Sequence, residues 1–397
     1  MKVCFLTLYT PYTNLVDGVS IAIYSISKYL RDLGCDVSVV GLDSSINFFK
    51  KNERNNIIYY RIPSTRINYS LDFIKYICII PKILQHIERE QKIDIFHAHG
   101  GYAIPLAIAN LKKAKKILKL QQTGLKEDEY IIQETISQKQ FLYALIRATI
   151  LRKKIMHFIR KWYYSKMDKI ISVTNYSAKL AQKKYSIQKE KIKVIWNGAD
   201  FNELIQLSKK IDIQQIDNIV LYFGRISYIK GIDTLLQAIK VLLPSCPNIQ
   251  LKLIGAGKSL PKYRYIAKNF GINKNVEFLG FLKGKELINR IMESKIVVMP
   301  SLSEGFPLTL AEAMILRKPI IASKLPVFEE ILSSTDCGLL FDAGDYKELA
   351  RNILYLLRDN RKRESIAQCA YEFAKDNLTL DKVAKETLKL YEVCITG

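Results

Sequence analysis

The sequence has no run of 18 or more apolar residues, so no segment has the length and hydrophobicity of a membrane-spanning helix. It has only four histidines and seven cysteines among 397 residues. No C-x-x-C pair and no Cys/His cluster shows the spacing of a zinc site. With 49% hydrophobic and 25% charged residues, the composition is that of a globular protein. It excludes disordered, collagen-like and disulfide-scaffold chains, and the length predicts two or three domains.

The scattered cysteines predict small buried hydrophobic side chains in a reducing compartment. They are Cys4, Cys35, Cys78, Cys246, Cys337, Cys369 and Cys394. The apolar run Met1–Leu6 is too short for the core of a signal peptide and predicts a first buried strand. We therefore expect a cytoplasmic protein.

Acidic residues are scarce: 38 Asp and Glu stand against 61 Lys and Arg, a net charge of +23. Residues 1–200 hold 33 of the basic and 16 of the acidic side chains. This surplus implies an acidic partner that meets the first half: nucleic acid, an anionic membrane surface or a phosphorylated substrate.

Short apolar runs alternate with helix-length amphipathic stretches, which predicts parallel sheets built from βαβ units. We expect an α/β fold of two Rossmann-like, doubly wound domains joined near Asp200, residues 1–200 and 201–380. A C-terminal helix, 381–397, could pack back toward the first domain. Ligands of such sheets bind beyond the carboxyl ends of the strands, so the site is expected in the cleft between the domains. The predicted strands are Val3–Leu8, Asp36–Leu42, Ile93–Phe96, Lys116–Leu120, Lys169–Val173 and Ile192–Ile195, then Ile219–Phe223, Gln250–Ile254, Val276–Phe278, Ile296–Met299 and Pro319–Ala322.

The loop Gly224–Gly231 follows a predicted strand and precedes the predicted helix Gly231–Leu243. Gly224 allows a tight turn, while Arg225 and Lys230 add two cations beside a helix amino end that already favours anions. This combination suits a diphosphate, with Arg as a planar fork and Lys as a point charge. A solvated basic turn is the alternative.

A second motif, Pro300–Met314, follows another buried strand and opens the predicted helix Leu308–Leu316. It carries Glu304 in the loop and Glu312 eight positions later, inside an apolar helix. A buried carboxylate is costly without a partner, and a ribose would supply hydroxyl donors. Helix capping explains one of these carboxylates but not both.

The two motifs, G-R-x4-K-G and E-x7-E, resemble those of retaining glycosyltransferases of the GT-B fold, family 4. The likeness extends to Leu253–Gly257, Val276–Gly280 and the crossing segment Ile195–Asp200, and so covers nearly the whole chain.

The resemblance implies a role for each matched residue. Arg225 and Lys230 would neutralise the leaving diphosphate, Glu304 with Gly305 and Phe306 would hold the donor sugar, and Glu312 would bind the ribose. The remaining implied donor-side residues are Gly18, Gly224, Gly255, Gly257 and the amides of Leu308, Thr309 and Leu310. The resemblance implies no metal or other cofactor, because these cations stabilise the leaving group electrostatically. It also implies that the leaving phosphate itself assists the deprotonation of the acceptor.

The first half matches the family pattern less closely. Gly18 fits the second of two expected glycines, whereas Asp17 replaces the first and could instead cap the following helix. His97 and His99 end a predicted strand, and the resemblance places one of them, His99 before His97, at the junction of sugar and acceptor. Thr123 stands where the family often has a further histidine.

Two basic segments carry most of the surplus charge, and apolar and aromatic residues interleave the second. This pattern is typical of an interfacial membrane helix, although an ordinary amphipathic helix against the core is the alternative. The expected acceptor or membrane residues are Lys112, Lys113, Lys115, Lys116, Arg152, Lys153, Lys154, Arg160, Lys161 and Trp162, in segments that also hold Lys119.

We therefore expect a glycosyltransferase at the inner face of the cell membrane. It would move a sugar from a UDP- or GDP-sugar to a lipid-linked or growing surface-polysaccharide acceptor. Two alternatives remain: a nucleotide-sugar epimerase or phosphorylase of the same fold, and a non-catalytic basic protein that binds membranes or nucleic acid. Nucleic acid is the least favoured partner, because no nucleic-acid-binding motif is present.

Overall fold

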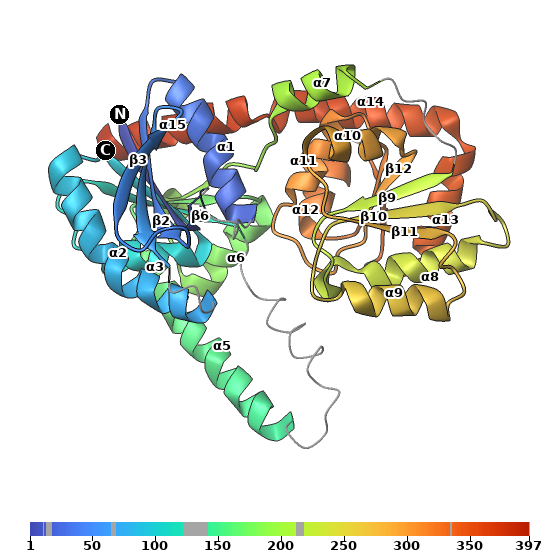
Figure 1. Cartoon of the computed structure of the whole chain (residues 1–397), viewed down its shortest axis with the longest axis horizontal. Helices are drawn as coiled ribbons and strands as arrows, with labels where there is room; N and C mark the ends of the chain where they lie inside the picture. The colour runs from blue at the N-terminus through green and yellow to red at the C-terminus, as the bar shows by residue number, and fades with distance from the viewer. Residues whose placement is uncertain are drawn as a thin grey trace. The chain divides into compact units, whose positions relative to one another are not determined.

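Two parallel sheets organise the chain, each in its own unit (Figure 1). In this computed structural model, residues 1–10, 12, 18–64, 69–121, 142–211, 218–333 and 336–396 are described. The first unit comprises Met1–Thr123, Arg147–Trp196 and Leu380–Gly397, and the second contains Asn197–Thr379. The chain thus crosses between units after Trp196, and the C-terminal helix belongs to the first.

The sheet of the first unit is parallel except for the antiparallel pair β3–β4. Apart from the polar edge strand β3, its strands are largely apolar, as expected when helices cover both faces. Their spatial order is β3 (Lys50–Arg54), β4 (Ile57–Pro63), β2 (Asp36–Asp43), β1 (Lys2–Tyr9), β5 (Ile95–His99), β6 (Lys115–Leu120), β7 (Lys169–Ser172) and β8 (Ile192–Val194).

Helices cover both faces of this sheet (Figure 1). One apolar cluster packs α1 (Gly18–Asp32) and α15 (Leu380–Thr396) against alternate residues of β1, such as Val3 and Phe5. A second cluster packs α2 (Tyr69–Gln91), α3 (Ile104–Ile108), the end of α5 (Leu142–Ser165) and α6 (Asn175–Tyr185) against the opposite face. Short 3-10 turns lie at η1 (Gly100–Ala103) and η2 (Lys189–Lys191).

The second unit holds six parallel strands, in the doubly wound arrangement that the sequence predicts. Their order is β11 (Val276–Gly280), β10 (Gln250–Ile254), β9 (Ile219–Phe223), β12 (Ile296–Met299), β13 (Ile320–Ser323) and β14 (Leu339–Phe341). The predicted bounds of β9, β10 and β12 agree with the structure residue for residue.

One apolar cluster joins this sheet to α8 (Ile232–Leu242), α9 (Leu260–Asn269) and α13 (Tyr346–Arg358), and Figure 1 shows α8 and α9 below the sheet. Elsewhere in the unit, α7 (Phe201–Lys209) packs against α10 (Gly284–Glu293) and α11 (Leu308–Ile315). Helix α14 (Asn360–Asn377) also packs against α11. The remaining short turns are η3 (Tyr228–Lys230), α12 (Pro326–Phe328) and η4 (Glu329–Ser333).

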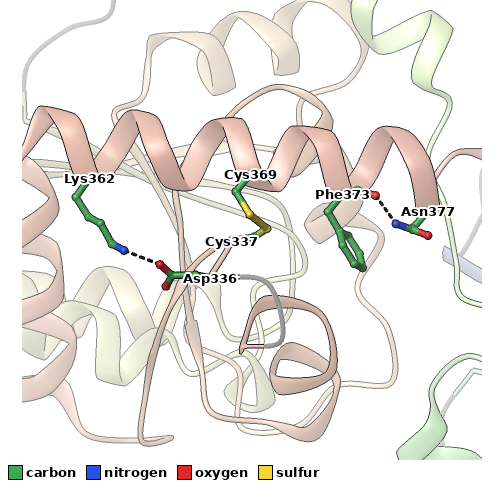
Figure 2. Close-up of a disulfide and its surroundings, with 6 residues drawn as sticks. All are labelled: Asp336, Cys337, Lys362, Cys369, Phe373 and Asn377. Atoms are coloured by element: carbon green, nitrogen blue, oxygen red, sulfur yellow. Dashed lines mark hydrogen bonds and ion pairs between the residues drawn. A yellow bond between two sulfur atoms is a disulfide. The ribbon is translucent and has the colours of Figure 1, made fainter.

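The cysteines correct one expectation. Cys337 and Cys369 form a disulfide that joins the segment before β14 to α14, as Figure 2 shows. Cys78 is exposed, whereas Cys4 is buried as the sequence predicts. The prediction of buried free cysteines was wrong for Cys78, which is exposed, and for the bonded pair. The pair could not be foreseen, because residues 32 positions apart meet only in the folded unit and their separation carries no recognisable motif.

Candidate active site

The loop after β9 brings two cations to the carboxyl edge of the second sheet. The amide of Gly224 donates to the carbonyl oxygen of Ile254, at the end of β10, over 2.9 Å. Arg225 is exposed, and Lys230 closes the turn η3 directly before α8. The Tyr222 hydroxyl donates to the Arg225 carbonyl oxygen at 2.8 Å, and burial raises its pKa. The loop therefore holds both cations beside the start of a helix.

Lys230 is paired with the first glutamate of the second motif. Its Nζ donates to Oε1 of Glu304 at 2.5 Å, and Oγ of Ser301 donates to the same oxygen at 2.7 Å. The Glu304 side chain is only 8% exposed and that of Lys230 17%. Because Lys230 follows β9, Glu304 follows β12 and these strands are neighbours, the sheet brings the two motifs together.

The glycine-rich loop after β10 packs tightly against the loop after β9. A Cβ on Gly255 would lie 1.7 Å from the carbonyl oxygen of Gly224, and one on Gly257 would lie 1.8 Å from that of Ile226. Both positions therefore exclude any side chain. The structure gives these glycines a packing role, which shapes the loop edge on which Arg225 and Lys230 sit.

The Ser227 hydroxyl is a site feature to which the sequence analysis assigned no role. Its oxygen is buried and has no hydrogen-bond partner among the residues that the structure describes. It lies in the same loop, three residues before Lys230. Ser227 and Ser301 lie within the two sequence motifs, so both could have been named as candidates from the sequence. Only the fold shows that the Ser301 hydroxyl already has a hydrogen-bond partner, Glu304.

Helix α11 begins at Leu308, directly after the loop that holds Glu304. The amide of Leu310 donates to the carbonyl oxygen of Pro307 at 3.1 Å, a bond back to the residue before the helix. The role of the first three amides of the helix in capping a phosphate stays a prediction. No such backbone partner is found in the described chain for the amides of Leu308 and Thr309.

Glu312 lies inside α11 among apolar neighbours, as its sequence context predicts. Burial, and then the negative charge of Glu203 on α7, raises the pKa of Glu312 to about 7. Among the described residues we find no hydrogen bond or ion pair to its carboxyl group. The preceding Gly305 and Phe306 are buried, and the Asn197 side-chain amide lies 3.5 Å from the Phe306 carbonyl oxygen.

In the first unit, β5 carries both candidate histidines to its carboxyl end. His97 and His99 are buried, and their ring centroids lie 5.0 Å apart. Nδ1 of His97 meets the Tyr391 hydroxyl on α15, and Nδ1 of His99 lies 3.1 Å from the Gln121 side-chain nitrogen. Burial holds the pKa of both imidazoles well below the usual value, so both are neutral at pH 7.

Comparison with known protein families identifies the class. Residues 205–373 match the family model of glycosyl transferases group 1, and residues 16–203 match the model of Glycosyltransferase Family 4. The chain is a glycosyltransferase. Its two sheets are those of the GT-B fold, which the sequence predicts.

Relatives match it along almost the whole chain. An uncharacterized glycosyltransferase of Methanocaldococcus jannaschii is 27% identical over 397 residues, covering 99% of this chain and 98% of the relative. Sucrose-phosphate synthase from Thermosynechococcus elongatus superposes with a TM-score of 0.79 at 16% identity, covering 100% and 99% of the two chains. HepE from Anabaena, solved with UDP and glucose, has a TM-score of 0.71 at 18% identity, with 99% of each chain covered.

The glycosyltransferase places its first basic segment at the amino edge of β6. Lys112 and Lys113 are exposed, whereas Lys115 and Lys116 are partly buried. Lys116 donates from Nζ to the carbonyl oxygen of Ala109 at 2.6 Å. Lys119, counted with this segment, lies at the opposite end of β6 and is buried. Lys119 therefore does not contribute to the positive surface charge of this segment.

The second basic segment forms α5 of the glycosyltransferase. Lys154, Lys161 and Trp162 are exposed, whereas Arg160 is partly buried beside Tyr185. Tyr163 and Tyr164, aromatic residues of the same segment, are buried in the core of the first unit. The end of α5 is thus an ordinary core helix on one side, and only its other side is free to meet a partner.

Some expectations lie outside the described residues: Asp17, the Gln122–Gly124 segment, and the side chains of Arg152 and Lys153. Gly18 is the first residue of α1. The part of the glycosyltransferase that the structure describes contains no group of three or more His, Cys, Asp or Glu side chains placed to hold a metal ion. It also contains no helix long and apolar enough to cross a bilayer.

Proposed function

We propose that the protein is a retaining glycosyltransferase that takes its sugar from a UDP- or GDP-sugar. The acceptor would be a lipid-linked or growing surface glycan. The observation that carries this proposal is the Lys230–Glu304 pair, held at 2.5 Å on the carboxyl edge of the second sheet. It places a cation for a diphosphate next to a carboxylate for a sugar, at the position where doubly wound sheets bind nucleotides.

These residues would act by electrostatic stabilisation. As the bond from sugar to diphosphate breaks, negative charge grows on the leaving oxygen, and Lys230 and Arg225 would stabilise it. The buried Ser227 hydroxyl, which has no partner among the described residues, would donate a further hydrogen bond to the phosphates. Glu304 would accept hydrogen bonds from sugar hydroxyls and so fix the orientation of the anomeric carbon.

Glu312 suits the ribose. A carboxyl group whose pKa is raised to about 7 is partly protonated at neutral pH, and no hydrogen bond satisfies it among the described residues. Two ribose hydroxyls would supply the missing partners and make the ionised form less costly. A nucleoside diphosphate sugar therefore meets Glu312, Lys230 and Glu304 with its ribose, diphosphate and sugar in turn. The UDP and glucose bound by HepE support a uridine donor.

We further propose that the enzyme works as a peripheral protein on the inner face of the cell membrane. Ile155, Phe158 and Trp162 are 48%, 69% and 41% exposed and, at spacings of three and four residues, share one face of α5. The exposed Lys154 and Lys161 adjoin this face. Apolar and aromatic residues beside cations fit an anionic bilayer surface, where each cation contributes about 1 kcal/mol.

A thermal-shift panel of UDP, GDP, ADP and their sugars tests the donor site. A ligand present at 100 times its Kd should add about 2.7 kcal/mol to the free energy of unfolding. Lys230→Met and Glu304→Gln should each abolish turnover of the donor that binds, while the exposed-site control Lys240→Met should not. Turnover that survives in either site variant contradicts the assignment.

Two product analyses test the retaining mechanism and the epimerase alternative. Retention predicts that the anomeric configuration of the product equals that of the donor, which the NMR coupling at the anomeric proton measures. Conversion of the nucleotide sugar to an epimer without any acceptor would identify an epimerase instead.

A further inference from the structure

Three nitrogen-bearing side chains gather at the carboxyl ends of β5 and β6. The register pairs His99 with Lys119 and His97 with Ile117. Residues paired in a parallel register point to the same face of the sheet, so Lys119 lies beside His99. His97 lies on the same face, two residues earlier on β5. His97, His99 and Lys119 are 0%, 2% and 3% exposed.

The polar atoms of this cluster are incompletely bonded. Nδ1 of each histidine has a neighbour, Tyr391 for His97 and Gln121 for His99. Nε2 of each is buried and has no hydrogen-bond partner in the part of the chain that is described. With the Gln121 amide nitrogen donating to Nδ1, the hydrogen of the neutral His99 ring lies on Nε2. We find no hydrogen bond or ion pair of Lys119 among these residues either.

Burying such a cluster is costly. Burial lowers the pKa of Lys119 to about 7 and keeps both histidines neutral. Among the described residues no carboxylate pairs with any of the three. An apolar side chain at position 119 would pack at less cost, as Ile117 does two residues earlier on the same face. The fold alone therefore gives no reason for an amine here.

We propose that Lys119 and His99 form a subsite for an anionic group, a carboxylate or a phosphate, on one of the substrates of the transfer. The inference rests on the proposed function for its substrates, but the subsite itself rests on the cluster. An anion would accept hydrogen bonds from the Lys119 ammonium and from Nε2–H of His99. It would also supply a countercharge, which no carboxylate among the described residues provides.

The subsite also gives selectivity. A neutral hydroxyl group could bond to His99, but it could not offset the cost of a buried ammonium group. The anionic substrate is then favoured, and its neutral analogue leaves a charge unpaired. Binding the anion raises the pKa of Lys119, so complex formation takes up a proton when the pH lies above about 7.

The first test observes the subsite directly. The chain has only four histidines, so the ring signals of a protein labelled with 15N-histidine are resolvable. Titration with inorganic phosphate should shift the His99 ring signal in the full-length enzyme. Lys119→Met should abolish that shift and Lys119→Arg should retain it. The exposed-lysine control Lys82→Met should behave as the wild type.

Two substrate pairs identify where the anion is carried. UDP-glucuronate against UDP-glucose tests the donor, and glucuronate against glucose in the presence of UDP tests the acceptor. We expect the anionic member of one pair to bind about tenfold or more tightly in the wild type and to lose that advantage in Lys119→Met.

The outcomes are separable. No histidine shift with phosphate and no anion preference in either pair overturn the subsite, as does a preference that Lys119→Met leaves intact. UDP binding in the same titrations reports on the proposed function alone. Unchanged UDP affinity in Lys119→Met shows that the donor site is intact. If Lys119→Met fails to fold, the phosphate titrations of the wild type and of Lys119→Arg still test the subsite, because both should show the His99 shift.

Discussion

Lys230 and Glu304, 74 residues apart in the sequence, form an ion pair of 2.5 Å on neighbouring strand ends. Each had a ligand-binding role in the sequence motifs, the lysine for a phosphate and the glutamate for a sugar. Within the pair, each charge neutralises the other. The pair therefore holds both side chains in position before a donor arrives, which lowers the cost of ordering them on binding.

Breaking this pair should separate stability from activity. Lys230→Met leaves a largely buried carboxylate unpaired and should lower the free energy of unfolding by about 2–4 kcal/mol. Glu304→Gln should also destabilise the enzyme. The double variant should regain part of the loss, because neither charge is then left alone, yet it should remain inactive. Urea unfolding of the four proteins measures the coupling energy, and strictly additive losses would show that the pair contributes none.

Glu312 predicts a stability change that depends on pH. Its pKa is about 7 in the folded enzyme and ordinarily 4.5, so between these values the folded state binds more protons than the unfolded state. The contribution of Glu312 to stability is full below about pH 4.5 and is lost as the pH rises through 7. Glu312→Gln should therefore gain about 1–3 kcal/mol relative to the wild type at pH 8 and nothing near pH 4.5.

Melting curves at several pH values check this, with the exposed Glu364→Gln as the control. The same Glu312→Gln variant should bind UDP more weakly, since its amide cannot ionise toward the ribose hydroxyls. An equal change in stability at every pH would mean that packing, and not titration, is responsible.

The disulfide should stabilise the second unit. Cys337 and Cys369 close a loop with a sequence separation of 32, for which the chain-entropy relation gives about 3–4 kcal/mol. Reduction with dithiothreitol should lower the melting temperature of the wild type but not that of Cys337→Ser/Cys369→Ser. Cys78→Ser is the matched control, because it removes an exposed free thiol and should leave the effect of reduction on the melting temperature unchanged. A wild type insensitive to reductant would contradict a stabilising role.

The exposed face of α5 predicts membrane binding that needs both apolar area and charge. Phe158→Ser/Trp162→Ser should weaken binding to vesicles with anionic lipid about tenfold or more. Lys154→Gln/Lys161→Gln should weaken it at low salt and have less effect at high salt. Phe281→Ser, at a residue 71% exposed in the second unit, is the control that removes an equally exposed aromatic side chain. Equal loss in the control would show nonspecific adsorption.

Much of the fold could be predicted because local apolar patterns report buried parallel strands directly. The strands β9 and β12 are buried throughout and β10 is buried after Gln250, and the bounds of all three follow from the pattern alone. Strand β3 was missed because its residues Lys50–Arg54 are polar and mostly exposed, so no apolar run marks it. The short β14 was missed because only one of its three residues is buried.

The sequence by itself determined the class of enzyme, since the donor motifs are contiguous and each occupies one strand-to-helix loop. Only the tertiary structure decided which side chains already have a partner within the protein. It paired Lys230 with Glu304, joined Cys337 to Cys369 and buried Lys119 beside His99. These facts depend on distances between segments far apart in the chain. The positive charge is likewise divided by burial, because a lysine on the surface and a lysine inside the sheet look the same in sequence but differ in pKa and in what they can bind.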